Sequence, residues 1–267
     1  QGDVSPDQNL VIFSTDVSAR GFRTIKVYDV NKRKVLKDTI KSIDGGHAWA
    51  ADSKTFFYTR QDPETLRSFQ VWRHQLGDSS EKDVLVYEEK DETFHCYVYT
   101  SKSGKYVIIG SSQTLTDEYR FIDSTKPNDE FQLFDQRVRG LEYDIDHIDD
   151  LFYIRTNLEA ENFRLMSATE KKTSRSEWKE VLPQRDGIHL NDFEVFQEFI
   201  VLEDQEKKDR ASKMGINDYN KIYTLNELVS GDALFAATGV TNGSMLSGIE
   251  NRNGLWTNTV VMRSSSG

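Results

Sequence analysis

The chain has 267 residues, of which 37% are hydrophobic, and its formal net charge at pH 7 is −10. This hydrophobic share is enough for a buried core and excludes a disordered polymer, whereas the net acidity argues against a nucleic-acid partner, which needs clustered lysine and arginine. No run approaches the ~18 apolar residues that span a bilayer, and the single cysteine excludes an intrachain disulfide, so we expect a cytoplasmic protein with no membrane partner.

Strand-like runs recur through the first two hundred residues at a nearly constant spacing. LVIF begins at 10, FFYT at 56, YVII at 106, LFYI at 151 and FIVL at 199, so successive starts are 46, 50, 45 and 48 residues apart. Turn-forming clusters such as SPDQN, AADSK and SKSGK precede several of these runs. The spacing indicates one structural unit that is repeated along the chain.

Further strand-like segments flank each of these runs at matching offsets. GHAWAA, FHCYVYT, LEYDID and DFEVF lie ahead of the turns, and two more sets follow, including SFQVWRHQL and DVLVYEE. Many alternate apolar with polar residues, which is typical of a strand with one buried face. Four short strands in roughly 45–50 residues predict a β-propeller blade, with a β-sandwich of coincidental spacing as the alternative. We expect the chain to enter at the second strand of one blade, complete three more, and leave after two strands of a fifth.

Several longer segments resemble a known family. WAADSKTFFYTRQDPETLRSFQVWRHQLG (49–77), RGLEYDIDH (139–147) and FYIRTNLEAENFRLM (152–166) are similar to the propeller of oligopeptidase B, a serine peptidase of the prolyl oligopeptidase family. The resemblance covers about residues 1–205. It implies a mainly β fold, with four to five blades of a seven-bladed ring that caps an α/β-hydrolase domain. In that family the cap admits short peptides, and cleavage follows Arg or Lys.

The resemblance also implies where catalysis takes place. The family's Ser, Asp and His all come from the hydrolase domain, and no G-x-S-x-G elbow occurs in residues 1–267. We therefore expect no catalytic residue, no cofactor and no peptidase activity from this chain alone, with peptide substrates acted on by a catalytic domain that it lacks. Arg139, Glu142, Asp146 and His147 lie around a predicted innermost strand and are candidates for inter-domain or gate contacts.

The last sixty residues differ in character, so we predict a boundary between 1–205 and 206–267. EKKDRASKMG favours a helix, and DALFAATG predicts a buried strand that ends in a glycine turn, which together indicate a short α/β segment. RASKMGINDYNKIYTLNELVSGDALFAATGVTNGSMLSGI (210–249) resembles the C-terminal part of class II fructose-1,6-bisphosphatase, a metal-dependent sugar phosphatase. That family's metal-binding carboxylates lie earlier in its sequence, so we carry over no catalytic or metal-binding residue.

Two segments of different resemblance predict a composite chain, made by fusion or by misassembly of a sequence; a diverged propeller tail is the alternative. The backbone N–H groups around Gly239, Thr241 and Gly243 are candidates to hold a phosphate. A tight strand–helix turn is the alternative role, because the G-x-x-x-x-G-K-[ST] pattern is absent. Three functions stay open: a non-catalytic peptidase cap that filters short basic peptides, a sugar-phosphate hydrolase, and a plain binding module.

Other chemically capable residues have simpler interpretations. The five histidines match no common metal-ligand spacing, and DIDH (144–147) is better explained as the end of a blade strand than as a metal site. EEKDE (88–92) predicts a solvated loop in preference to an acidic ligand run. Cys96, in a predicted innermost strand, is expected to be a packed thiol and not a nucleophile.

Overall fold

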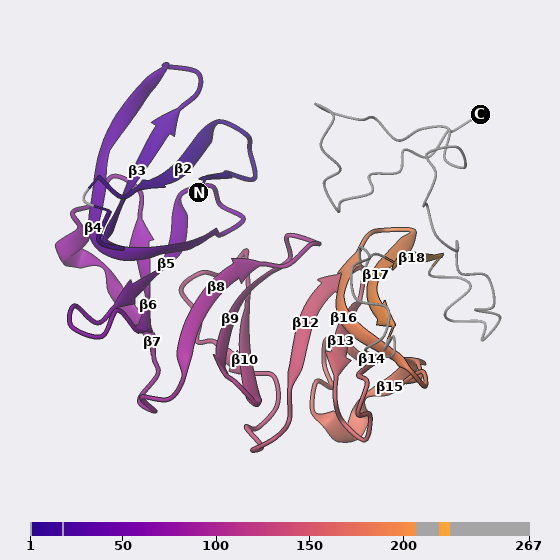
Figure 1. Cartoon of the computed structure of the whole chain (residues 1–267). Helices are drawn as coiled ribbons and strands as arrows, with labels where there is room; N and C mark the ends of the chain where they lie inside the picture. The colour runs from indigo at the N-terminus through magenta and orange to yellow at the C-terminus, as the bar shows by residue number, and fades with distance from the viewer. Residues whose placement is uncertain (1, 18, 207–218, 225–267) are drawn as a thin grey trace, which may run out of the picture.

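The computed structural model describes residues 2–17, 19–206 and 219–224, and all regular elements in these ranges are strands except two short 3-10 turns. The mainly β prediction is therefore confirmed. The sheets follow one another in chain order along an arc, from the first strands in indigo to the last in orange (Figure 1). Each sheet is a meander in which successive strands pair antiparallel, as in propeller blades.

The first seven strands form one continuous sheet that contains two blades. Its strands are β1 (Gly2–Val4), β2 (Leu10–Thr15), β3 (Arg23–Asp29), β4 (Lys34–Trp49), β5 (Thr55–Gln61), β6 (Ser68–Gln75) and β7 (Val84–Glu88). β4 belongs to both blades, because its first half pairs with β3 and its second half pairs with β5. The register shifts between Ile43 and His47, where the strand passes from one blade to the next. β1 adds a short innermost strand to the first blade, so the expectation that the chain enters at the second strand was wrong.

Three further sheets complete the arc. The third blade has β8 (His95–Thr100), β9 (Tyr106–Gln113), β10 (Thr116–Asp123) and β11 (Gln132–Leu133). The fourth has β12 (Tyr143–Ile148), β13 (Leu151–Thr156), β14 (Arg164–Thr169) and β15 (Lys179–Leu182). The last has β16 (Ile188–Val195), β17 (Phe199–Glu206) and β18 (Tyr219–Thr224), so it contains three described strands and not the expected two.

The hydrophobic core is divided among the interfaces between neighbouring blades. Ile12, Ile25 and Phe56 belong to a cluster between the first and second blades, and comparable clusters lie between the second and third, the third and fourth, and the fourth and last. The second strand of a blade contributes to two clusters. Ile108 packs toward the fourth blade, for example, whereas its neighbour Val107 packs toward the second. Both faces of these strands are buried, which explains why FFY and VII show no polar alternation.

Repeated turn geometry accompanies the repeated sheets. The amide of Ser5 donates to the carbonyl of Leu10 at 2.9 Å, and Ser101 makes the same bond to Tyr106 at 2.9 Å. Three residues into each turn the backbone has a positive φ, 60° at Gln8 and 70° at Gly104. The turn-forming clusters in the sequence therefore mark equivalent hairpins of successive blades.

Candidate functional site

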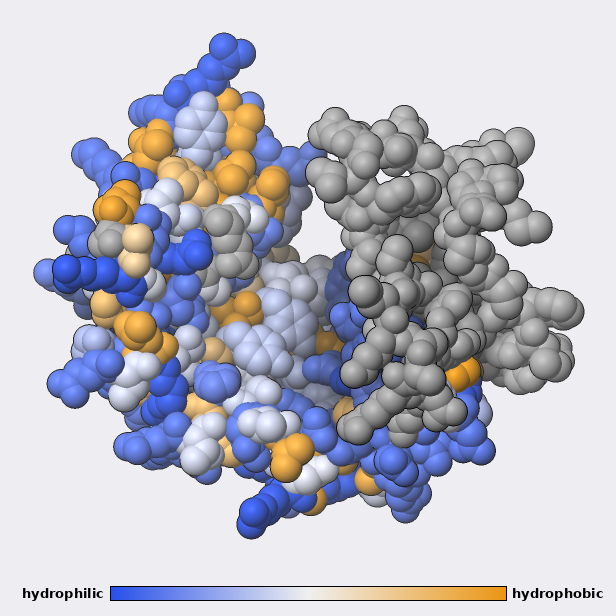
Figure 2. Space-filling model, in the orientation of Figure 1, coloured by the Kyte–Doolittle hydropathy of each residue, from blue (hydrophilic) through white to orange (hydrophobic). Residues whose placement is uncertain are grey.

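A pocket of about 210 Å³ opens where the innermost strands of the third, fourth and last blades approach one another. The hollow that the arc encloses is lined mainly by side chains of intermediate hydropathy (Figure 2). Aromatic rings and carboxylates share the pocket wall. Its lining residues are Tyr97, Tyr99, Tyr119, Asp144, Ile145, Asp146, Asp192 and Phe193.

Three tyrosines form one rigid side of this pocket. Tyr97 and Tyr99 alternate along β8, and their rings stack with centroids 6.1 Å apart. The hydroxyls of Tyr97 and Tyr119 are hydrogen-bonded at 2.7 Å, and the Tyr99 hydroxyl donates to the carbonyl of Ile145 at 2.7 Å. The Tyr119 hydroxyl also lies 3.2 Å from Oδ1 of Asp144. Every phenol is held by a partner, so these rings are fixed before any ligand arrives.

The carboxylates form the opposite side. Asp144 is paired with Arg155 at 2.5 Å, and the Arg155 guanidinium lies over the ring of Phe163. Asp146 accepts from the amides of Lys102 at 2.8 Å and His147 at 2.7 Å. Asp192 accepts from the amide of Phe193 at 2.7 Å, with no described cation in salt-bridge contact. Within the described chain, this leaves two carboxylates of the pocket, Asp146 and Asp192, without a cationic side chain as ion-pair partner.

Burial and like charges make the pocket electrostatically unfavourable for anions. Partial burial raises the pKa of Asp192, and the Asp144 carboxylate raises it further, whereas the Phe193 amide and the Arg155 charge act to lower it. Burial likewise raises the pKa of Asp146, and this outweighs the lowering by the amide hydrogen bonds from Lys102 and His147 and by the Lys102 charge. Just behind the tyrosines, burial raises the pKa of Asp117 to about 6. A cation in the pocket would relieve this repulsion, and the flat aromatic rings would contact it favourably.

The four predicted gate residues occupy different environments. Asp146 lines the pocket, whereas Glu142 lies just before β12 and accepts from the Asn157 side chain at 3.2 Å. Arg139 is exposed in the preceding loop. His147 is fully buried, with Nδ1 2.8 Å from the Ser103 hydroxyl and Nε2 2.9 Å from Glu170. The structure therefore brings only Asp146 into the pocket, and the inter-domain role of these residues stays a prediction.

Several other sequence interpretations can be placed on the structure. Gly239, Thr241 and Gly243 lie outside the described residues, so their phosphate role stays a prediction. Cys96 is buried, which confirms a packed thiol, and burial raises the pKa of that thiol to about 12. Within the described residues, no group of three or more His, Cys, Asp or Glu side chains is placed to hold a metal ion.

The solvated-loop interpretation of residues 88–92 is wrong for Glu89. Its side chain is buried and accepts from Arg137 at 2.6 Å, from Tyr87 at 2.7 Å and from the Ser111 hydroxyl. Burial works to raise the pKa of Glu89, but these hydrogen bonds outweigh it and lower the pKa to about 2. Glu89 thus anchors the segment that connects β7 to β8, and β8 is the strand that carries Tyr97 and Tyr99 of the pocket.

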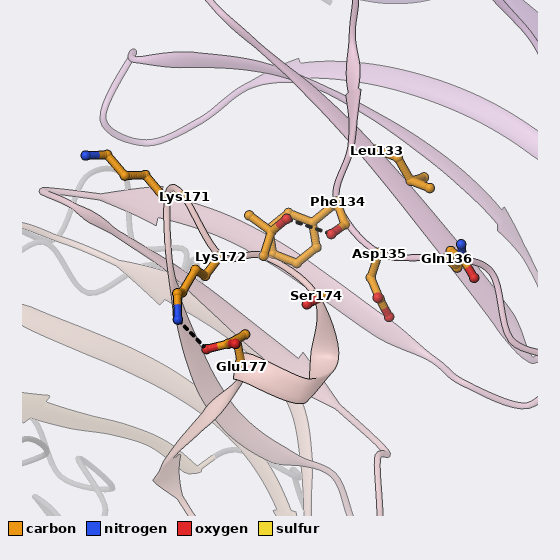
Figure 3. A pocket seen from close by; sticks show the side chains of 9 residues that line it. Leu133, Phe134, Asp135, Gln136, Lys171, Lys172, Ser174 and Glu177 are labelled. Carbon is orange, nitrogen blue, oxygen red and sulfur yellow. Dashed lines mark hydrogen bonds and ion pairs between the residues drawn. The ribbon is translucent and has the colours of Figure 1, made fainter.

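A second, shallower pocket of about 390 Å³ lies at the outer rim between the third and fourth blades (Figure 3). Its polar side chains contact one another: Lys172 pairs with Glu177 at 3.2 Å, and the Thr173 hydroxyl donates to the carbonyl of Phe134 at 2.7 Å. Asp135 pairs with Arg175 at 3.2 Å. These contacts pair the charged and polar groups of the rim pocket with one another, so the inner pocket is the better candidate for binding.

Sequence reasoning missed most of the inner pocket. Tyr97, Tyr99, Tyr119 and Asp192 were not singled out, and Asp144 was considered only within DIDH as the end of a blade strand. The alternation of Tyr97 with Tyr99 and of Asp144 with Asp146 nevertheless places each pair on one side of its strand. Those two alternations were the sequence features from which the pocket-lining sides of β8 and β12 could have been predicted. The approach of three blades at one point depends on the curvature of the arc, which local sequence does not specify.

Comparison with known proteins gives two family matches. The prolyl oligopeptidase N-terminal β-propeller domain matches residues 1–221, and the bacterial fructose-1,6-bisphosphatase, glpX-encoded, matches residues 194–267. The two matches overlap at 194–221, which includes part of β18. The order of the two resemblances expected from the sequence is confirmed, whereas the boundary at 205 stays a prediction.

Individual relatives agree with the first match. The chain is 34% identical over 201 residues to dipeptidyl aminopeptidase BI of Pseudoxanthomonas mexicana, covering 75% of this chain and 28% of the relative. It is 39% identical over 145 residues to protease 2 of Moraxella lacunata, covering 54% of this chain and 21% of that protein. The structure of oligopeptidase B from Leishmania major superimposes with a TM-score of 0.73 at 25% identity, over 84% of this chain and 31% of that one. The chain thus spans less than a third of the length of these relatives. No helix among the described residues is long and apolar enough to cross a membrane.

Proposed function

Because the chain belongs to the prolyl oligopeptidase family, through its N-terminal β-propeller domain, we propose that it acts as the substrate-filtering part of a peptidase and favours short basic peptides. Catalysis is assigned to an α/β-hydrolase domain with which the propeller would work, in a cytoplasmic enzyme that cleaves after Arg or Lys. The single buried cysteine is compatible with a reducing location.

The observation that carries this proposal is the inner pocket. Asp146 and Asp192 present carboxylates without cationic ion-pair partners among the described residues, beside the fixed rings of Tyr97 and Tyr99. A guanidinium or ammonium group can contact a ring face and a carboxylate at the same time. The position on innermost strands would expose peptides to this pocket as they pass through the propeller. Selection there would act on binding and entry, and the pocket itself would supply no nucleophile.

Peptide binding tests this assignment directly. We would measure the fluorescence anisotropy of a labelled tetrapeptide containing two arginines, and of the same peptide with neutral citrulline in both positions. The arginine peptide should bind at least about tenfold more tightly, which corresponds to ~1.4 kcal/mol. Asp192→Asn should remove most of this difference, whereas Glu177→Gln, the same charge change at the outer rim, should leave it intact. Equal affinity for both peptides would contradict a filter for basic substrates.

Activity assays separate filtering from catalysis. The chain alone should leave Arg-containing fluorogenic dipeptides uncleaved, because the proposal gives it no catalytic residue. Robust turnover that persists in a repurified sample would show that a nucleophile is present and would overturn the non-catalytic role.

Sugar-phosphate hydrolysis is the second candidate, favoured by the match of residues 194–267 to the bacterial fructose-1,6-bisphosphatase family. Phosphate release from fructose 1,6-bisphosphate in the presence of Mg²⁺ or Mn²⁺ would support it. We expect none, because the match begins in a propeller strand and covers only 74 residues. Binding of the arginine peptide without either activity would favour the plain binding module.

A further inference from the structure

A buried histidine joins the first two blades at a point that the proposed function does not use. His74, on β6 of the second blade, is fully buried. Its Nδ1 lies 2.6 Å from Oδ1 of Asp83, just before β7, and its Nε2 lies 3.3 Å from Oδ1 of Asp38. Asp38 belongs to the half of β4 that pairs with β3, so it is part of the first blade. The contact therefore crosses from one blade to the other.

The geometry determines the protonation state of this imidazole. Carboxylate oxygens can only accept hydrogen bonds, and a neutral imidazole has a single N–H. Contacts to carboxylates at both nitrogens therefore need the doubly protonated, positively charged ring. Burial works to lower the pKa of His74, but Asp83 and Asp38 outweigh it and raise the pKa above its ordinary value.

The titratable groups around the ring come from three segments of the first two blades. They are Asp38 from β4, Asp83 before β7, and Tyr58 from β5, whose hydroxyl donates to Asp83 at 2.7 Å. The ring of Phe56 packs against the imidazole with centroids 4.9 Å apart. Asp83 has Tyr58 as a second partner, and Asp38 accepts from the amide of Gly77. Both carboxylates are thus held in place. The protonated imidazole donates one hydrogen bond to each of them and so links the first blade to the second.

We propose that His74 is a pH-sensitive latch between the first and second blades, closed when its imidazole is protonated and released on the Asp38 side when the proton is lost. A neutral ring keeps the shorter Asp83 contact, because a single N–H at Nδ1 satisfies it. The longer Asp38 contact then loses its donor and leaves two buried lone pairs facing each other. The loss would weaken the side-chain link between the first half of β4, which belongs to the first blade, and β6 of the second blade.

The sign of the effect follows from linkage. A group whose pKa is raised in the folded state adds stability that is fully present below its unfolded pKa and is lost as pH rises through the folded pKa. The first blade should therefore open more often at alkaline pH. The opening equilibrium should change about tenfold for each unit by which the pKa of His74 exceeds ~6.5.

The test combines histidine NMR with amide hydrogen exchange of the full chain. The pKa of His74, read from its ring proton, should lie above ~6.5. Exchange of residues 23–41, corrected for intrinsic rates, should accelerate as pH rises through that pKa, whereas residues 151–169 of the fourth blade should not respond. Asp38→Asn should flatten the pH dependence, and Asp78→Asn, an exposed carboxylate in the adjacent turn, should preserve it.

Three results would overturn the latch. They are a His74 pKa at or below the ordinary value, an unchanged pH dependence in Asp38→Asn, and faster exchange that is shared equally by all blades. His74→Gln offers a further check, since it should remove the pH response of residues 23–41. If that variant does not fold, the wild-type titration and Asp38→Asn still decide the proposal.

Discussion

The ring of Tyr97 lies directly against Gly110, its cross-strand partner on β9. A Cβ added at Gly110 would overlap with the ring and would lie 2.6 Å from its hydroxyl oxygen. Glycine at this position therefore lets the phenol lie flat over the sheet, within reach of the Tyr119 hydroxyl. One side of the inner pocket depends on this close approach.

Replacing Gly110 by alanine should displace Tyr97 and lower the free energy of unfolding by about 2–3 kcal/mol, the cost of an overpacked site. Chemical denaturation measures it. Gly2→Ala is a matched control, because the added Cβ there would have an ordinary 3.5 Å contact with a carbonyl oxygen. In a Tyr97→Ala background, Gly110→Ala should lower the free energy of unfolding only slightly, because the ring that the new Cβ would meet is gone. If Gly110→Ala destabilised the Tyr97→Ala variant by the full ~2–3 kcal/mol, contact with the Tyr97 ring would not be the cause of the strain.

Asp117 should make the protein less stable at alkaline pH. Burial raises its pKa to about 6, so its contribution is present below the unfolded pKa and is lost as pH rises through about 6. The Tyr143 amide donates to the Asp117 carboxylate at 3.1 Å in the wild type. The side chain of Asp117→Asn can still accept this hydrogen bond and carries no charge. The variant should be about 1–2 kcal/mol more stable than the wild type at pH 8. Denaturation at pH 4 should show a much smaller gain, and an equal gain at both pH values would exclude the ionisation as the cause.

Glu89 has the opposite dependence on pH. Its pKa is lowered to about 2, so its stabilisation is present above the unfolded pKa of ~4.3 and is lost as pH falls toward 2. Glu89→Gln should lower the free energy of unfolding by about 2–3 kcal/mol at pH 7, because Arg137 loses a buried partner. Glu88→Gln is the control: Glu88 is an exposed neighbour that accepts from Gln70 at 2.8 Å. If Glu89→Gln destabilised the protein equally at every pH down to about 2.5, the negative charge of Glu89 would not be the source of its stabilisation.

The thiol of Cys96 should report on opening between the second and third blades. It packs with Phe57, Val98 and Val107, and burial raises its pKa to about 12. At pH 8 a thiol reagent should therefore react orders of magnitude more slowly than with an exposed cysteine, at a rate set by opening of the protein. Mass spectrometry of the labelled chain measures that rate. Labelling as fast as for a free thiol would contradict the packing.

The sequence predicted the repeated unit well, for a physical reason. Hairpin turns are locally encoded, so clusters such as SKSGK mark successive blades at a regular spacing. The continuity of β4 could not be foreseen, because Gly45 and Gly46 favour a turn. The strand nevertheless continues past them, because pairs with β3 as far as Ile43 and with β5 at Ile43 and from His47 onward hold the backbone on either side of the glycines.

The candidate site was predicted much less completely. Asp146 was identified by its place in an innermost strand. Tyr119 comes from the third strand of its blade and joins the pocket wall through contacts with Tyr97 and Asp144. Glu89 appeared to belong to a charged loop because its neighbours are polar. Its burial depends on Arg137, 48 residues later in the chain, and no local pattern connects the two.

Each apolar cluster is shared by two adjacent blades, and the described clusters form a series along the arc. Cooperativity in such an assembly passes from neighbour to neighbour, as in a one-dimensional lattice. A lesion such as a cavity between the third and fourth blades should therefore weaken those two sheets first and reach the terminal ones only through intermediates. Partial unfolding, with some sheets lost and others intact, becomes an accessible behaviour of this protein.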